Sequence, residues 1–177
     1  VLDELRDAII TPENHLDLLR VFGLFQSSLE DSRIAGSISD FLLSGFPHPD
    51  RNVRWEQVRL LGAYRVAQGF PKLLASLETE TNLVTQFHIV QSLARLPRGW
   101  TADEEERAVE WLLGTQTGWF AEFPGKGVEF PLFWSSALAE FGEHHREALL
   151  RALPKIRLTS LLGSIVIDLL AVSSRPV

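Results

Sequence analysis

The densest group of ionisable side chains in this 177-residue chain is the run EHHRE at residues 143–147. Zinc sites on helices usually take ligands four residues apart, and adjacent histidines do not have that spacing. His145 falls on the apolar side of the surrounding helical pattern, and His144 lies beside it. Histidines in such places commonly form structural hydrogen bonds, so we predict a core or rim histidine and no metal site.

Two further histidines could take part in acid–base chemistry. His48 lies between Pro47 and Pro49, which favours packing within a turn. His88 lies on a predicted helix, but no carboxylate within sequence reach could orient it as a catalytic base. We therefore predict that His88 makes a structural hydrogen bond to a neighbouring turn.

The remaining motifs that suggest chemistry are weak. Gly125-Lys126-Gly127 lacks the further glycine and the following Ser or Thr of a phosphate-binding loop. The acidic run 103–106 falls in the first turn of a predicted helix, where the helix dipole favours negative charge. We predict no catalytic residue, no cofactor site, no metal site and no enzyme activity in this chain.

The charge balance argues against nucleic acid as a partner. The formal net charge is −6, and the first fifty residues carry nine acidic residues against three arginines. Binding to phosphates requires a basic surface, which such a chain lacks. Four arginines do cluster along one predicted helix, but they spread over several of its faces, so a solvated helix is favoured over an anion site: Arg51, Arg54, Arg59 and Arg65.

Composition also bounds the size and the redox chemistry of the chain. A chain of this length with 45% hydrophobic residues suits one domain with a substantial core. With no cysteine, it has no disulfide, thiolate zinc site or covalently attached haem. Because the sequence starts at Val1 and contains no methionine, we expect a processed product, an excised domain or a fragment of a larger protein.

No segment of the sequence predicts a membrane-spanning helix. The longest apolar run extends from Leu158 to Val172 and is interrupted by Asp168. That run is shorter than the roughly 20 residues that a bilayer-spanning helix needs. We expect a packed terminal helix and no membrane insertion.

Helical spacing of apolar residues dominates the chain, and no segment shows the alternation of a strand. Three helix starts carry capping signals: Thr11 before Pro12, Asp50, and a capping box formed by Thr101 and Glu104. The predicted helical segments are 1–25 as a helical pair, 32–43, 51–67, 70–77, 84–94, 102–113, 135–153 and 156–172.

The inward face of each predicted helix identifies a candidate core. Ile34 and Val84 also fall on these stripes. The residues that we predict to be buried are Trp55, Val58, Leu61, Phe87, Val90, Leu112, Leu138, Phe141, Leu162 and Ile165.

Residues 114–134 interrupt the helical pattern with four glycines and two prolines, and we predict an irregular insert there. Its aromatic side chains are of the type that anchors protein interfaces, although they could equally fold back onto the core. The residues that we predict to contact a partner or an adjoining domain are Trp119, Phe120, Phe123, Lys126 and Phe130.

An internal repeat in the sequence indicates how the predicted helices are arranged. Residues 57–61 (QVRLL) align with residues 86–90 (QFHIV) at an offset of 29, and Tyr64 aligns with Leu93. Helical pairs at such a period bury their apolar faces by stacking. The sequence therefore predicts an all-α fold, an α-solenoid of stacked antiparallel helix pairs, forming a single domain over residues 1–177.

Two segments carry a family resemblance. Residues 50–54 (DRNVR) followed by 60–62 (LLG) resemble the short HEAT-like repeat of phycobilin-lyase-type solenoids. A second set is similar to the repeat segment of planctomycete-type membrane-bound dehydrogenases, which combine HEAT-like repeats with a c-type haem domain: 86–89 (QFHI), 93–95 (LAR), 99–101 (GWT), Glu105, Arg107, Trp111 and Leu112.

The resemblance spans residues 47–153, and residues 124–130 (PGKGVEF) depart from the family pattern. It implies a periplasmic or exported setting, with any haem outside this chain. Two functions follow as expectations. The first is a non-enzymatic scaffold or protein–protein interaction module that binds a protein partner or adjoining domains. The second is an accessory domain that positions the redox domains of an exported haem-containing dehydrogenase.

Overall fold

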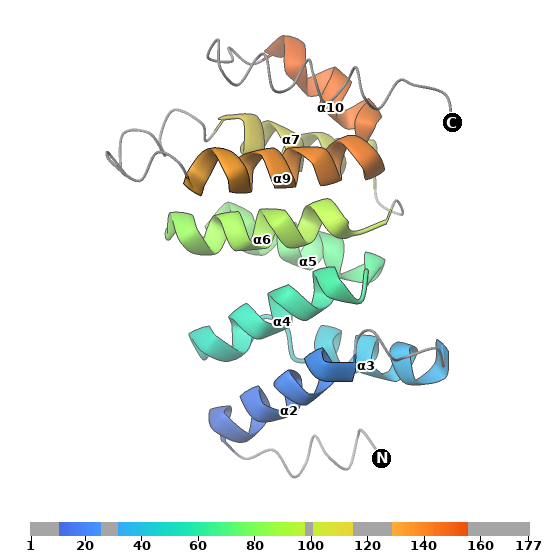
Figure 1. Cartoon of the computed structure of the whole chain (residues 1–177), viewed down its shortest axis with the longest axis vertical. Helices are drawn as coiled ribbons and strands as arrows, with labels where there is room; N and C mark the ends of the chain where they lie inside the picture. Colours follow the sequence, from blue (N-terminus) through green and yellow to red (C-terminus); the bar gives the residue numbers. More distant parts are fainter. Residues whose placement is uncertain (1–10, 26–31, 98–100, 115–128, 156–177) are drawn as a thin grey trace. The chain divides into compact units, whose positions relative to one another are not determined.

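The computed structural model describes residues 11–25, 32–97, 101–114 and 129–155, with the side chains of 32–33 and 129–133 excepted. Within these ranges all regular structure is helical, which confirms the all-α prediction (Figure 1). The α-helices are α2 (Pro12–Phe25), α3 (Ser32–Ser44), α4 (Arg51–Ala63), α5 (Phe70–Thr79), α6 (Leu83–Arg95), α7 (Ala102–Gly114), α9 (Glu129–His144) and α10 (Arg146–Ala152). Two 3₁₀ turns accompany them, η1 (Ala67–Gly69) and η2 (Leu153–Lys155).

The predicted helix starts are confirmed at the level of single hydrogen bonds. The Asp50 carboxylate accepts the amides of Asn52 and Val53, at 2.9 and 3.1 Å. Thr101 accepts the Glu104 amide at 3.3 Å, while the Glu104 carboxylate accepts the Thr101 amide at 3.0 Å. Such caps satisfy amides that have no partner inside the helix, so they fix where each helix begins.

The chain divides into two compact units, Val1–Ser92 and Leu93–Val177. In the first unit α2 packs against α4, and α3 also contacts α4. The Tyr64 hydroxyl donates to the Phe22 carbonyl at 2.8 Å, which ties the end of α4 to α2. Lys72 of α5 donates to the Leu43 carbonyl of α3 at 2.6 Å. Contacts between elements that are not neighbours in sequence therefore join the described helices α2, α3, α4 and α5 of this unit.

Helices α4 and α6 of the first unit run in the same direction. Near their starts, the Trp55 indole donates to the Thr85 hydroxyl at 3.1 Å. Near their ends, a Cβ built on Gly62 would lie 2.9 Å from the Cα of Ser92. The two backbones therefore approach closely at Gly62, where a glycine is needed because a larger residue would collide with the Ser92 backbone.

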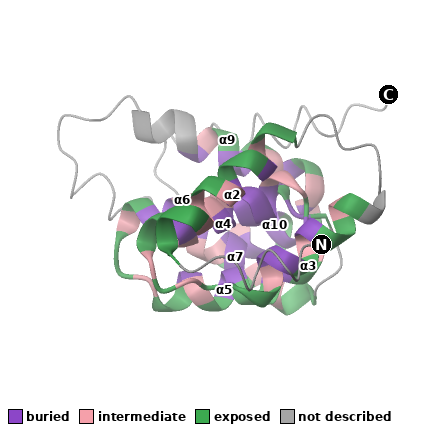
Figure 2. Cartoon of the chain, turned by 90° about the horizontal axis from the view of Figure 1, so that it is seen from below, coloured by how far each residue is buried: buried purple, intermediate pink, exposed green. Residues whose placement is uncertain are grey.

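The described helices carry buried residues on one side and exposed residues on the other (Figure 2). Seven predicted core residues are buried: Val58, Leu61, Phe87, Val90, Leu112, Leu138 and Phe141. Trp55 was predicted to be buried and is only half-buried, because it lines a groove. The assignments of Ile34 and Val84 to the buried stripe were wrong, since these side chains are 48% and 47% exposed. Leu162 and Ile165 lie outside the described residues.

The second unit is built on α7, α9 and α10. Trp134 of α9 is fully buried, and its indole donates to the Leu112 carbonyl of α7 at 3.1 Å. Glu106 of α7 pairs with Arg151 of α10 at 3.2 Å and also with Lys155, whose ammonium reaches Glu110 at 2.9 Å. A buried tryptophan therefore joins α9 to α7, and ion pairs join α10 and η2 to α7.

Three predicted boundaries were wrong. Helix α4 ends at Ala63 instead of Ala67, because Arg65 adopts a φ of 52°, which ends a right-handed helix. The predicted helix over 135–153 is two helices, since His145 has φ −134° and ψ 35° between α9 and α10. The predicted irregular insert of 114–134 stops earlier, because α9 already begins at Glu129, with Pro131 in its first turn.

A buried glutamine holds the loop that precedes α4. Gln57 is fully buried; its Nε2 donates to the Gly45 carbonyl and its Oε1 accepts the His48 amide, both at 3.1 Å. The His48 ring in turn accepts the Asp50 amide on Nδ1 at 3.0 Å, which confirms its predicted role in the turn. None of the described helices combines the length and apolar character needed to span a membrane.

Candidate functional site

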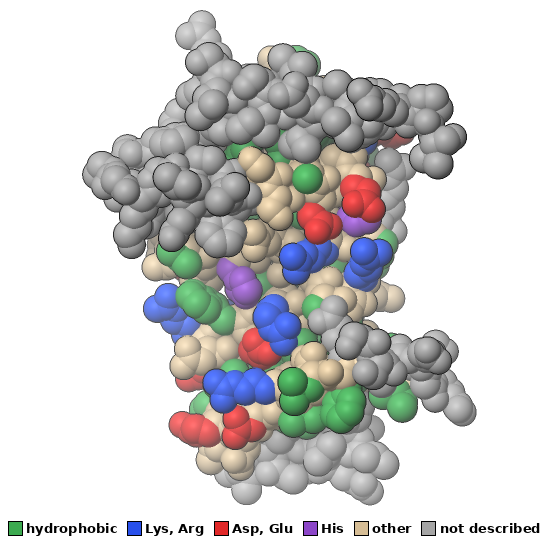
Figure 3. All heavy atoms as spheres, in the orientation of Figure 1, with side chains coloured by type: hydrophobic (Ala, Val, Ile, Leu, Met, Phe, Trp, Pro, Cys, Tyr) green, Lys and Arg blue, Asp and Glu red, His purple; other side chains and the backbone are tan. Residues whose placement is uncertain are grey.

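The first unit carries a groove of about 480 Å³ on the face formed by α2, α4 and α6. Figure 3 shows this face, with basic and acidic side chains close together over α2 and α4. The groove is lined by Leu16, Arg20, Asn52, Trp55, Glu56, Arg59 and His88. A volume of this size holds several side chains of a partner or one small molecule.

Trp55 forms the aromatic wall of the groove. Its indole N–H is occupied by Thr85, so the ring is fixed in place. The Arg51 guanidinium lies 4.7 Å from the centre of the ring, a cation–π contact. The His88 ring lies 5.7 Å away at an angle of 43°, and its Nε2 is 3.0 Å from the Trp55 carbonyl. The predicted structural hydrogen bond of His88 is present, but its partner is a helix carbonyl instead of a turn.

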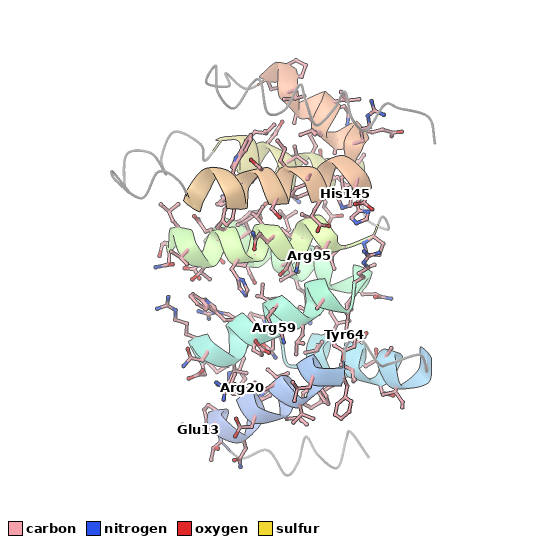
Figure 4. All side chains as sticks on the ribbon, in the orientation of Figure 1. Glu13, Arg20, Arg59, Tyr64, Arg95 and His145 are labelled. Carbon is pink, nitrogen blue, oxygen red and sulfur yellow. The ribbon has the colours of Figure 1, made fainter. Side chains whose placement is uncertain are left out.

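Two arginines from different helices provide the positive charge. Arg59 of α4 donates two hydrogen bonds to Glu56, at 3.0 and 2.6 Å, and these bonds raise the pKa of its guanidinium. Arg20 of α2 pairs with Asp17 at 3.0 Å, and both of these side chains are largely exposed. Figure 4 labels Arg20 and Arg59 on these two adjacent helices. Glycine at position 23 leaves room for the Arg59 guanidinium beside α2, because a Cβ there would lie 2.3 Å from its Nη2.

The second unit holds a buried histidine at the break between α9 and α10. His145 is fully buried, with Nε2 at 2.9 Å from the Leu96 carbonyl and Nδ1 at 3.3 Å from Glu105 (labelled in Figure 4). Burial lowers the pKa of His145, and the nearby Glu105 partly opposes that shift. The prediction of a hydrogen-bonded core histidine is confirmed.

One group of side chains in the described residues has the geometry of metal ligands. Glu140, Glu143 and His144 place one ligand atom each within 4.8 Å of one another at the end of α9. Glu140 and His144 are four residues apart, which is the ligand spacing that the two adjacent histidines lack. The guanidinium of Arg95 lies 3.8 Å from Glu140 and competes for its carboxylate, so the group fits an ion pair as well as a cation site.

The predicted partner-contact residues are not placed by the structure. Trp119, Phe120, Phe123 and Lys126 lie outside the described residues, and of Phe130 only the backbone is described, within α9. Trp134, at the end of the predicted insert, packs into the core. The predicted contact surface at the insert therefore stays a prediction.

Sequence reasoning missed two residues of these sites. Glu105 was expected to be a first-turn acid, yet it is buried and faces His145, which lies 40 residues later. Arg20 lines the same groove as Arg59 only because α2 packs on α4. Neither local spacing nor charge patterning carries such long-range information.

No protein-family model, no curated protein and no solved structure matches this chain.

Proposed function

We propose that this chain is a helical-repeat module that binds a protein partner, without catalytic activity of its own. The observation that carries the proposal is a match in environment between residues 29 positions apart on α4 and α6. Val58 and Phe87, Leu60 and Ile89, and Leu61 and Val90 are all buried. At the same offset, the half-buried pair Arg59 and His88 both line the groove.

The two glutamines of the repeat support the same proposal. Gln57 donates its Nε2 to the Gly45 carbonyl, and Gln86 donates its Nε2 to the Glu80 carbonyl at 2.6 Å. In both cases the side chain holds the loop that precedes its own helix. A repeated bond of this kind favours two copies of one structural unit, stacked as in a solenoid.

Stacked repeats present a row of equivalent positions on one face, and such faces bind extended partners. The groove adds a half-buried tryptophan flanked by arginines, the residue types that dominate interface energies. We therefore place the partner on the face formed by α2, α4 and α6.

Site-specific photo-crosslinking tests this proposal. A photoreactive amino acid at Asn52, which lines the groove, is expected to give one discrete adduct with a protein in an extract of the source cells. The matched control carries it at Ala75, which is exposed on α5. An adduct at position 52 that persists after Trp55→Ala, or equal labelling at both positions, would contradict a specific partner in the groove.

A further inference from the structure

We propose that the groove recognises an acidic side chain beside an apolar one on an extended segment of the partner, an inference that rests on the proposed function. The acidic group would lie between Arg20 and Arg59, and the apolar one on Leu16 and the edge of Trp55. The proposal names the chemistry of the partner, which the function alone leaves open.

The charges of the lining favour an acid. Arg20 and Arg59 face one carboxylate, that of Glu56, and Arg59 already neutralises it through two hydrogen bonds. Asp17, which pairs with Arg20, does not line the groove and is largely exposed, so an incoming carboxylate can share that guanidinium at small cost. A guanidinium has five N–H donors, so neither arginine is saturated by its internal partner.

The aromatic wall disfavours a basic partner. A lysine or arginine would bind Trp55 through the face of its ring, but Arg51 already lies 4.7 Å from the ring centre. A second cation would compete with Arg51 and would be repelled by Arg59. An acid is attracted by the positive charges of Arg51, Arg20 and Arg59, and it competes with Glu56 and Asp17 only for donors that these two carboxylates leave unused.

The other lining residues suit a peptide better than a free anion. Leu16 and the ring of Trp55 offer apolar surface that an inorganic anion cannot use. Asn52 is exposed and provides both a donor and an acceptor, which matches a peptide group of an extended chain. The groove therefore combines a charged contact, an apolar contact and a main-chain contact.

Titration of the ¹⁵N-labelled full chain with defined peptides tests the proposal by NMR. One probe is the blocked peptide Gly-Ser-Glu-Leu-Glu-Ser-Gly, the second replaces each Glu with Lys, and sodium acetate serves as the free carboxylate. The reporter is the indole N–H signal of Trp55, assigned by its loss in Trp55→Phe. We expect the Glu peptide to shift this signal at millimolar concentration and the other two probes to leave it in place.

Matched variants locate the charge. Arg20→Gln is expected to weaken binding of the Glu peptide about fivefold to tenfold, the effect of one lost charged contact. Arg65→Gln removes the same charge from an exposed position outside the groove and is expected to leave the affinity unchanged. Added salt is expected to weaken the wild-type interaction, because exposed charges are screened.

Four results would overturn the proposal. They are equal or tighter binding of the Lys peptide, an equal response to acetate, equal effects of the two arginine variants, and no response to any probe. If a photo-crosslinked partner at Asn52 accompanies one of these results, the interaction role stands and only the acidic preference fails. If neither peptide nor partner binds, the proposed function fails as well.

Discussion

Trp55 and Trp134 show how the two units use the same side chain differently. Both donate the indole N–H to an oxygen at 3.1 Å, Trp55 to the Thr85 hydroxyl and Trp134 to the Leu112 carbonyl. Trp134 is fully buried within the second unit, whereas Trp55 is half-buried at a groove of the first unit. An indole hydrogen bond therefore orients a tryptophan in either setting, and exposure of the ring decides whether it can also meet a partner.

The side chains around the two tryptophan rings also differ in polarity. Around Trp55 lie charged and polar groups that neutralise one another, such as Arg59 and Glu56, and that remain reachable from solvent. In the second unit, apolar side chains such as Leu112 and Leu138 are fully buried, as Trp134 is. We infer that the first ring contributes mainly to binding and the second mainly to stability.

The largest expected effect is that of Trp134→Ala. Removing a fully buried tryptophan leaves a cavity and removes its hydrogen bond to the Leu112 carbonyl, so the free energy of unfolding should fall by about 3–5 kcal/mol. Chemical denaturation monitored by circular dichroism measures it. Trp55→Ala is the matched comparison and should cost clearly less. If the two variants lost equal free energy of unfolding, the assignment of Trp134 to the core and of Trp55 to the groove would be contradicted.

Gly62→Ala should produce the next largest effect, because α4 and α6 must approach closely for Trp55 to reach Thr85. The added Cβ would lie 2.9 Å from two carbons of Ser92, so we expect a loss of about 1–3 kcal/mol in denaturation experiments. Gly36→Ala in α3 is the control, since nothing lies within 4 Å of the new Cβ. That variant should gain stability by about 0.5–1 kcal/mol from its helix propensity.

A smaller effect should appear as a dependence of stability on pH. Burial lowers the pKa of His145 below its ordinary value of 6.5, so the unfolded chain binds this proton more readily. The contribution of neutral His145 to the free energy of unfolding is fully present above pH 6.5 and declines as the pH falls toward the lowered pKa. Burial and the nearby His48 also lower the pKa of His15, which adds a decline of the same sign.

Denaturation between about pH 7 and about pH 5 measures this decline, above the range where most carboxylates titrate. His145→Gln keeps an amide donor for the Leu96 carbonyl but removes the titration. We expect this variant to show a shallower slope than the wild type. A slope unchanged from the wild type would contradict the assignment to His145.

The smallest effect should be that of Trp55→Phe. The phenyl ring retains most of the apolar surface, and only the indole bond to Thr85 is lost. Because Thr85 is buried and also bonds to Asn82 at 3.2 Å, we expect a loss of about 0.5–1.5 kcal/mol. Thermal unfolding measures it. A larger loss would indicate that Trp55 belongs to the core after all.

The sequence predicted what local signals encode. The caps at Asp50 and Thr101 and the stripe through Phe87 and Val90 identify helices and their inner faces, because capping and helical period act within a few residues. The alignment of Gln57 with Gln86 in the sequence predicts equivalent positions, and each side chain bonds to the loop that precedes its own helix.

The remaining features depend on contacts between distant segments. His145 and its two neighbours in sequence are neither proline nor glycine; the ring of His145 lies against Leu96 and Glu105, which are far away in sequence. Trp55 is half-exposed at a groove that also contains Arg20 and Arg59. These side chains meet in one groove only because α2 packs on α4. A single sequence gives helical period and charge, but not which helix faces cover one another.

The buried amide of Gln57 also constrains how this protein can be redesigned. It accepts from the His48 amide and donates to the Gly45 carbonyl at the same time. Among side chains of similar length, an ionised glutamate offers no donor, lysine and arginine offer no acceptor, and methionine offers neither. In a saturation mutagenesis experiment, position 57 should therefore accept fewer residue types than Leu61, where size and apolarity are the main requirements.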